Sequence, residues 1–184
     1  MALHGEAFSA EEKRRNFAYY EAQTVRDSSL AAGTQAVLAA EVGDVQLAYD
    51  YLAEAALLDH QDMHRNTSDG LHLAALASGW IAVISGLAGA RHYDGRLSFA
   101  PRLPQPLRRI AFPYKFQGRD LHVEVGPANA TYRLRAGAPI ELKHWGTAFT
   151  LTSETPAVIP IPPPPPLLPL RQPTGRAPRR RLPA

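Results

Sequence analysis

The sequence predicts an α + β chain, in which a helical segment is followed by a segment of short strands. Three observations support this class. Apolar residues recur at spacings of three and four through residues 1–90. Residues 94–152 change to an alternation of apolar and polar residues. Residues 156–184 contain eleven prolines and favour an extended, disordered tail. We therefore expect domains at 1–92 and 93–155 and a disordered Pro/Arg-rich tail at 156–184.

Four helices are expected in the first segment, over about 9–22, 28–43, 44–59 and 70–87. Ser9 and Glu12 have the spacing of a capping box, which predicts the first helix start. Gly43 followed by Asp44 predicts a helix end and an immediate new start. One face of the third helix is apolar, and it consists of Leu47, Ala48, Tyr51, Leu52, Ala55 and Leu58.

The fourth expected helix lies in a stretch without charged side chains, from Gly70 to Ala90. Such a length invites a transmembrane interpretation. Its four glycines, two serines and one histidine lower the hydrophobicity, and no basic cluster flanks it closely. We favour a helix that is buried on all sides, which needs more cover than three neighbouring helices provide.

The second segment predicts five or six short antiparallel strands that form a small sandwich or partial barrel. Apolar residues alternate over 121–125, 131–135 and 140–143, and Phe112, Tyr114 and Phe116 share one face. Glycines mark the turns between the strands, at positions 95, 118, 126, 137 and 146.

Composition excludes several classes of protein. The chain has no cysteine, which excludes a disulfide scaffold, a thiolate zinc site and a cysteine nucleophile. Its net charge of +3 comes from the tail, because residues 1–155 carry 15 basic and 17 acidic side chains. We expect no nucleic-acid partner and no membrane partner. The first residues lack a basic stretch followed by an apolar run, so we expect a cytoplasmic protein.

Two segments contain residues that could bind an anion. The first runs from Thr24 to Leu30, where Arg26, Ser28 and Ser29 lie at an expected helix start. Hydroxyls, free helix amides and an arginine together suit a phosphate. The alternative is that Asp27 or Ser28 is only the N-cap of the helix. Spacing by itself favours this structural role.

The second segment is His64–His72, in which Ser68 or Asp69 could cap the fourth helix and His72 would lie in its first turn. There the imidazole could reach an anion at the helix mouth, or it could be a satisfied structural residue. His60, His64 and His72 do not have a recognised metal-ligand spacing, so we expect no metal.

Together these segments resemble glycoside hydrolase family 65, which includes maltose, trehalose and kojibiose phosphorylases. The similarity runs in order from about residue 8 to residue 151, which makes it more specific than any single motif. It favours the anion-binding interpretation of both segments. The segments that resemble the family are 13–21, 24–30, 39–44, 66–72, 77–80 and 94–104.

The resemblance implies the last helices of an (α/α)6 catalytic barrel, followed by a small C-terminal β domain. It also implies an inverting disaccharide phosphorylase, in which a glutamic acid protonates the glycosidic oxygen and inorganic phosphate attacks the anomeric carbon. The products would be β-glucose 1-phosphate and a free sugar. Ser28, Ser29 and His72 would bind the phosphate, and Arg26, where many members have histidine, is a further candidate. No metal or organic cofactor is implied.

The family's catalytic glutamic acid would lie upstream of Met1, so we assign no catalytic residue here and expect little turnover from this chain alone. The expected partners are a disaccharide and inorganic phosphate, with an N-terminal complementing chain or a second copy as protein partner. Three alternatives stay open: a hydrolase of the same family, a non-catalytic carbohydrate- or phosphate-binding module, and an interaction protein that acts through its Pro/Arg tail.

Overall fold

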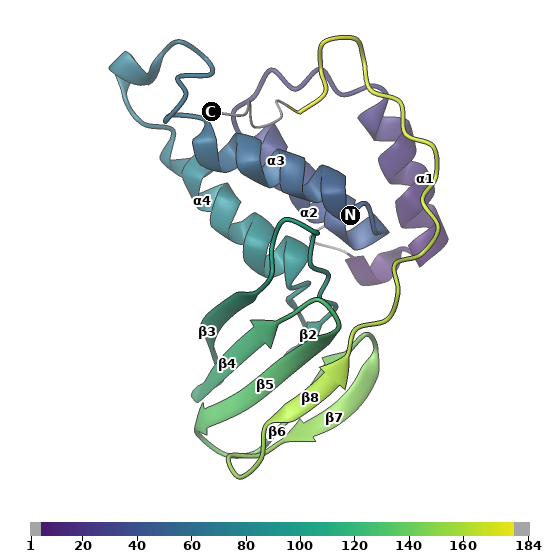
Figure 1. The fold of residues 1–184 in the computed structure, drawn as a ribbon, viewed down its shortest axis with the longest axis vertical. Coiled ribbons are helices and arrows are strands. Elements are labelled where there is room, and N and C mark those ends of the chain that lie inside the picture. Colours follow the sequence, from purple (N-terminus) through teal and green to yellow (C-terminus); the bar gives the residue numbers. More distant parts are fainter. Residues whose placement is uncertain (1–4, 179–184) are drawn as a thin grey trace. The chain divides into compact units, whose positions relative to one another are not determined.

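The computed structural model describes residues 5–178, and the chain divides into two compact units (Figure 1). The helical unit combines the chain up to Gly86 with the chain from Pro165 onward. The β unit runs from Leu87 to Pro164. Helices thus precede strands, and the α + β class is confirmed. The two units meet at residues 86 and 87, near the expected division at 92, and the chain from Pro165 onward groups with the helices.

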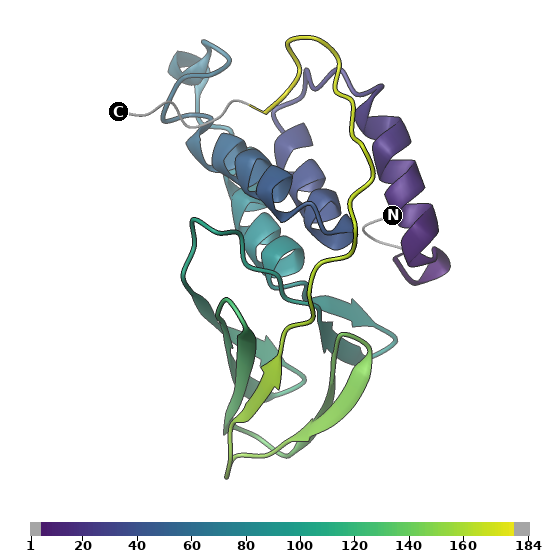
Figure 2. The ribbon, with the colours of Figure 1, turned by 45° about the vertical axis from the view of Figure 1, so that its right-hand side comes forward.

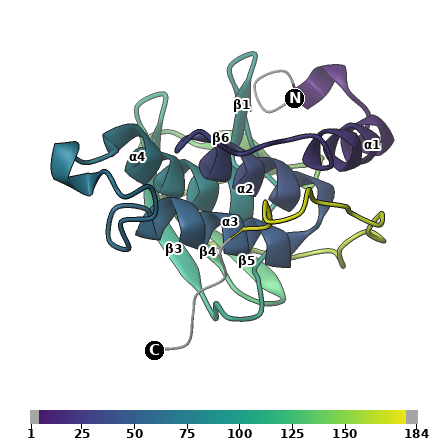
Figure 3. The ribbon, with the colours of Figure 1, turned by 90° about the horizontal axis from the view of Figure 1, so that it is seen from above.

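Four α-helices form the body of the helical unit. Seen from above, α2 and α3 lie side by side, and α4 packs against both of them (Figure 3). The elements are η1 (Gly5–Ala7), α1 (Ala10–Glu21), α2 (Ala31–Val42), α3 (Val45–Leu57), η2 (Thr67–Asp69), α4 (Leu73–Ile81) and a π-helical segment η3 (Ala82–Leu87).

The predicted helix boundaries are confirmed at two places. At α1, the Ser9 hydroxyl accepts the amide proton of Glu12, and the Glu12 carboxylate accepts the amide proton of Ser9 at 2.8 Å. Gly43 ends α2 with a φ of 98°, and Asp44 caps α3 by accepting the amide proton of Leu47 at 3.0 Å. Local side-chain chemistry therefore fixes both boundaries.

The fourth helix differs from the prediction in length and in burial. The α-helix ends at Ile81 and continues as η3. Ala75 and Gly79 are buried, whereas Leu73 and Trp80 are 72% and 60% exposed. Within this chain the helix is therefore buried on one face only, and the further cover that we expected for its apolar residues does not come from the described residues. Within residues 5–178, no helix has the length and apolarity that crossing a membrane requires.

The β unit contains eight strands in two four-stranded sheets (Figure 2). One sheet has the order β1-β2-β6-β7, and the other has the order β3-β4-β5-β8. All pairs are antiparallel except β2 and β6, which run parallel with Ser98 opposite Lys143. The strands are β1 (Arg91–Tyr93), β2 (Arg96–Phe99), β3 (Ile110–Phe116), β4 (Arg119–Val125), β5 (Asn129–Ala136), β6 (Ile140–His144), β7 (Thr147–Leu151) and β8 (Ala157–Pro160).

The core of the β unit lies between its two sheets. The Tyr132 ring on β5 packs 5.3 Å from the Phe99 ring on β2 and 5.2 Å from the Phe149 ring on β7. The predicted alternation is confirmed on β4, where every second residue from Leu121 onward is buried. These residues are Leu121, Val123 and Val125. The small sandwich is therefore present, with more strands than the five or six expected and with one parallel pair.

The predicted disordered tail requires a correction. Residues 157–160 form β8, whose backbone pairs with β5 and places Ile159 opposite Ala130. Because β8 is an edge strand, Pro160 does not interrupt the sheet. The part of the tail at 179–184 lies outside the described residues. The first four residues, on which the expectation of no secretory leader partly depends, also lie outside them.

Candidate functional site

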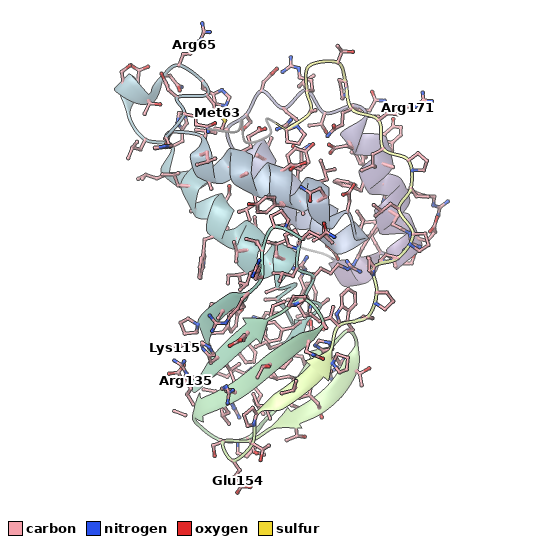
Figure 4. All side chains as sticks on the ribbon, viewed as in Figure 1. Met63, Arg65, Lys115, Arg135, Glu154 and Arg171 are labelled. Carbon is pink, nitrogen blue, oxygen red and sulfur yellow. The ribbon has the colours of Figure 1, made fainter. Side chains whose placement is uncertain are left out.

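The two candidate segments meet around one cavity of the helical unit. The turn after α1 contributes one wall, and the loop after α3 contributes another. Figure 4 labels Met63 and Arg65 in that loop, where Arg65 points away from the helices. The cavity has a volume of about 270 Å³ and is lined by Arg26, Asp27, Glu54, Met63, His64, Gly175, Arg176 and Ala177.

Arg26 lies in the wall of this cavity, and its guanidinium group contacts other protein groups. The side chain forms an ion pair with Glu54 and is only 6% exposed. Its Nε donates to Gln35 at 3.1 Å, and its Nη1 donates to the carbonyl oxygen of Arg176. The guanidinium carbon also lies 4.6 Å from the centre of the Tyr51 ring. These contacts hold Arg26 in the turn, and a contact with phosphate stays a prediction.

Ser28 and Ser29 lie in the turn before α2, because this helix begins at Ala31 and not at the expected Ser28. The Ser28 hydroxyl accepts the amide proton of Leu30 at 3.2 Å. Ser28 is exposed, and Ser29 is partly exposed. Leu30 stands at the N-cap and has no side-chain oxygen, so no side chain caps this helix start. The arrangement leaves the hydroxyls at the open N-terminus of a helix, where an anion is favoured.

His72 is the N-cap residue of α4, and a buried carboxylate holds it. Asp59 accepts the His72 backbone amide proton at 2.7 Å and lies 2.6 Å from His72 Nδ1. The other ring nitrogen, Nε2, lies 3.3 Å from Nδ2 of Asn66. Because a carboxylate only accepts, Nδ1 carries a proton, and Nε2 of the neutral ring accepts a hydrogen bond from the Asn66 amide.

Of the predicted site residues, only Arg26 lines the cavity, and the two serines and His72 lie next to residues that line it. Arg26 and Asp27 line it immediately before Ser28, and the His64 ring, which also lines it, lies 6.1 Å from the His72 ring. Among residues 5–178, no hydrogen bond joins either serine to His72. In the same described range, no three His, Cys, Asp or Glu side chains come close enough to hold a metal ion.

Sequence reasoning missed a buried polar network beside the cavity. The Glu21 carboxylate accepts hydrogen bonds from the Tyr51 hydroxyl, from Gln35 at 3.1 Å and from Gln172 at 2.7 Å. Burial, followed by the hydrogen bond to Glu21, raises the pKa of the Tyr51 hydroxyl far above its usual range. Tyr51 was expected on the apolar face of its helix, and nothing in its spacing indicated that its hydroxyl would reach α1. Asp59 was missed because nothing in its spacing indicated that its carboxylate would contact His72, 13 positions later.

Comparisons with known proteins agree with this organisation. Residues 1–81 match the model of the glycosyl hydrolase family 65 central catalytic domain, and residues 90–151 match that of the family's C-terminal domain. The fold resembles a solved human-microbiome protein assigned to the kojibiose phosphorylases, with a TM-score of 0.81 and 24% identity. That likeness covers 87% of this chain and 22% of the other.

Several curated relatives have related sequences. An uncharacterised glycosyl hydrolase of Mycobacterium leprae is 46% identical over 97% of this chain. The α,α-trehalose phosphorylase of Thermoanaerobacter brockii is 37% identical over 82% of it. The chain spans only 23% and 20% of the lengths of these two relatives. The two domain matches, in the order of the helical and β units, show that the chain belongs to glycoside hydrolase family 65.

Proposed function

We propose that this chain carries the phosphate-binding half of an inverting disaccharide phosphorylase, within the last helices of an (α/α)6 barrel. Ser28, Ser29 and His72 are the proposed phosphate ligands. The observation that carries the proposal is the pairing of His72 with the buried Asp59, next to His64, which lines the same cavity as Arg26 and Asp27, the two residues before Ser28. The similarity to a trehalose phosphorylase supports it.

The arrangement suits a phosphate chemically. The serine hydroxyls can donate to phosphate oxygens at the N-terminus of α2, whose partial positive charge favours an anion. When the ring takes up a second proton, His72 can donate from Nε2 to phosphate in place of its contact with the Asn66 amide, while Nδ1 stays bonded to Asp59. The Asp59 carboxylate then balances the charge of the imidazolium, so the ring can face an anion as a cation.

Phosphorolysis needs two further events at the substrate. A carboxylic acid gives its proton to the glycosidic oxygen, and a phosphate oxygen forms a bond to the anomeric carbon as the glycosidic bond breaks. None of the acids of this chain is proposed as that general acid. The chain therefore supplies the site of the nucleophile, and the acid comes from the remainder of the catalytic domain.

Hydrolysis is the second candidate function. The Mycobacterium leprae relative, which matches almost the whole chain, is named a glycosyl hydrolase. A hydrolase needs a carboxylate base to activate water, whereas the proposed position holds His72. Phosphate is therefore the favoured nucleophile, and the two functions differ in whether phosphate is consumed.

Titration with inorganic phosphate tests the proposed site in the 184-residue chain, with backbone amide chemical shifts of residues 24–30 as the readout. Binding should weaken about tenfold in the variant Ser28→Ala/Ser29→Ala and in His72→Ala, because each loses hydrogen bonds to a charged group. Asp69→Ala is the control, since this exposed residue lies in the same loop as His72. Equal affinity in all four proteins would remove these residues from the site.

A second experiment distinguishes the two reactions. The chain is combined with the N-terminal part of the Thermoanaerobacter brockii enzyme, and maltose, trehalose and kojibiose are offered with and without phosphate. A phosphorylase releases a sugar phosphate and needs inorganic phosphate. Release of free glucose without phosphate would instead favour the hydrolase.

A further inference from the structure

The C-terminal segment 165–178 contacts the helical unit through specific side chains, and we call it the strap. Figure 1 shows it in yellow, running alongside α1. We infer that the strap positions the phosphate-binding turn, residues 24–29, and that Arg176 is the positioning residue. The inference rests on the proposed function, which gives the turn its role in phosphate binding. The proline-rich composition of the strap did not predict a positioning role.

The middle of the strap is anchored by a hydrogen-bonded glutamine. Nε2 of Gln172 donates to the Glu21 carboxylate at 2.7 Å and to the Tyr51 hydroxyl at 2.9 Å. Glu21 is 3% exposed, and Tyr51 is fully buried. A buried carboxylate is costly unless donors surround it, and the strap supplies one of the three donors to Glu21. Gln172 is therefore part of the polar core of the helical unit.

An apolar contact anchors the strap nearer to its start. Leu167, Leu168 and Leu170 line a small cleft together with Phe17 of α1 and Val42 of α2. Phe17 and Val42 are both buried. The leucines thus extend an existing apolar surface, which removes apolar area from water on both sides of the contact.

The end of the strap contacts the phosphate-binding turn at two consecutive residues. The carbonyl oxygen of Arg176 accepts a hydrogen bond from the Arg26 guanidinium, and the Arg176 guanidinium forms an ion pair with Asp27. These are the two residues that directly precede Ser28. The strap therefore holds the backbone from which the proposed phosphate ligands extend.

The conformation of the turn explains why it needs such support. Arg26 has a φ of 57°, in the left-handed region that residues other than glycine rarely adopt. Contacts from Glu54, Gln35 and the strap fix the Arg26 side chain, and through it the position of the residue in the turn. Loss of the strap contact lets the turn relax toward ordinary backbone angles, which moves Ser28 and Ser29.

The test measures the turn and phosphate binding separately in the full chain. Arg176→Ala removes the ion pair to Asp27, and Arg176→Lys retains the positive charge. Arg171→Ala is the matched control, because Figure 4 shows Arg171 pointing away from the helices. The readouts are hydrogen exchange of the amides of residues 24–30, the affinity for inorganic phosphate and the thermal midpoint of unfolding.

Exchange in the turn should accelerate about tenfold in Arg176→Ala, and phosphate binding should weaken several-fold, since the lost bond joins two charged groups. The thermal midpoint should change little, because both partners of the ion pair are partly exposed. Arg176→Lys should restore most of the protection, and Arg171→Ala should behave like the wild type. A merely structural role would lower the thermal midpoint without a selective change in the turn.

The outcomes separate this inference from the proposed function. Unchanged exchange and unchanged phosphate affinity in Arg176→Ala overturn the inference, even if His72→Ala weakens phosphate binding. If no variant affects phosphate binding but the turn still exchanges faster in Arg176→Ala, the proposed function fails and the strap's positioning of the turn is upheld. Gln172→Ala provides a second variant, in which the backbone amides of the strap and of the turn should both exchange faster.

Discussion

Asp59 holds His72 at two points, through the backbone amide at 2.7 Å and through Nδ1 of the ring at 2.6 Å. The carboxylate follows α3 and the histidine precedes α4, so this contact also ties the two helices together. Because Asp59 is buried, its charge is not screened by water, and it orients the ring strongly. The same carboxylate therefore serves the fold and the proposed phosphate site.

Replacing Asp59 with alanine should impair both roles. The His72 amide and Nδ1 lose their acceptor, which should lower the free energy of unfolding by about 1–3 kcal/mol and weaken phosphate binding about tenfold. Urea unfolding and phosphate titration measure the two effects. Asp69→Ala should change neither. A folded Asp59→Ala protein with wild-type phosphate affinity would contradict the role of Asp59 at the site.

The close approach of α2 and α4 depends on the absence of a side chain at Gly33. A Cβ atom there would overlap the Cβ and Oγ atoms of Ser78. Gly33→Ala should therefore destabilise the helical unit by about 1–3 kcal/mol through overpacking. Gly79→Ala is the control, because its Cβ would lie 3.8 Å from Ala56 and alanine favours the helix by about 1 kcal/mol.

The thermal midpoints of the two variants should move in opposite directions. Combining Gly33→Ala with Ser78→Gly should recover part of the lost stability, since the overlapping atoms are removed. Equal midpoints for Gly33→Ala and the wild type would show that α2 and α4 can separate at no cost.

The elements that the sequence predicted best depend on neighbouring residues. The capping box at Ser9, the stop and restart at Gly43, and the alternation on β4 each follow from chemistry within a few positions. The same holds for strand turns such as Gly118, whose φ of 74° favours glycine. Local patterns suffice here because the partner residues are close in sequence.

The relationships that the sequence did not predict join distant residues. Gln172 reaches Glu21 and Tyr51, although 151 and 121 positions separate them. Proline content predicted an extended, disordered chain and could not show that one glutamine would donate to a buried carboxylate. Likewise, Arg26, Ser28 and Ser29 suggested a phosphate site from their spacing alone, whereas the partners that hold Arg26 come from α2, α3 and the strap.

The hydroxyl of Tyr51 links α3 to α1 and to the strap, so Tyr51→Phe tests the buried network. The variant keeps the ring beneath Arg26 but removes a donor to the Glu21 carboxylate. We expect a loss of about 1–3 kcal/mol in the free energy of unfolding. Tyr20→Phe, at a position 60% exposed, is the control and should be neutral. Unchanged stability in Tyr51→Phe would show that water replaces the hydroxyl.

Stability of the β unit should depend on pH through His144, which is buried between the sheets. Nδ1 lies 2.7 Å from the Tyr132 hydroxyl, and Nε2 lies 3.1 Å from the carbonyl oxygen of Pro160. Burial lowers the pKa of His144, and the bond to Pro160 only partly opposes this shift. A carbonyl can only accept, so Nε2 carries the proton of the neutral ring and fastens β8 to the sandwich.

The lowered pKa fixes the sign of the effect. As pH falls below about 6.5, the unfolded chain takes up a proton at His144 before the folded chain does, and the free energy of unfolding decreases. The loss stops below the folded-state pKa, where both states are protonated. Urea unfolding from about pH 5 to 8, followed by amide resonances of β4 and β5, measures this slope. His144→Gln should remove much of the slope, whereas replacement of the exposed His60 by glutamine should leave it intact. An identical slope in His144→Gln and the wild type would assign the pH dependence to other groups.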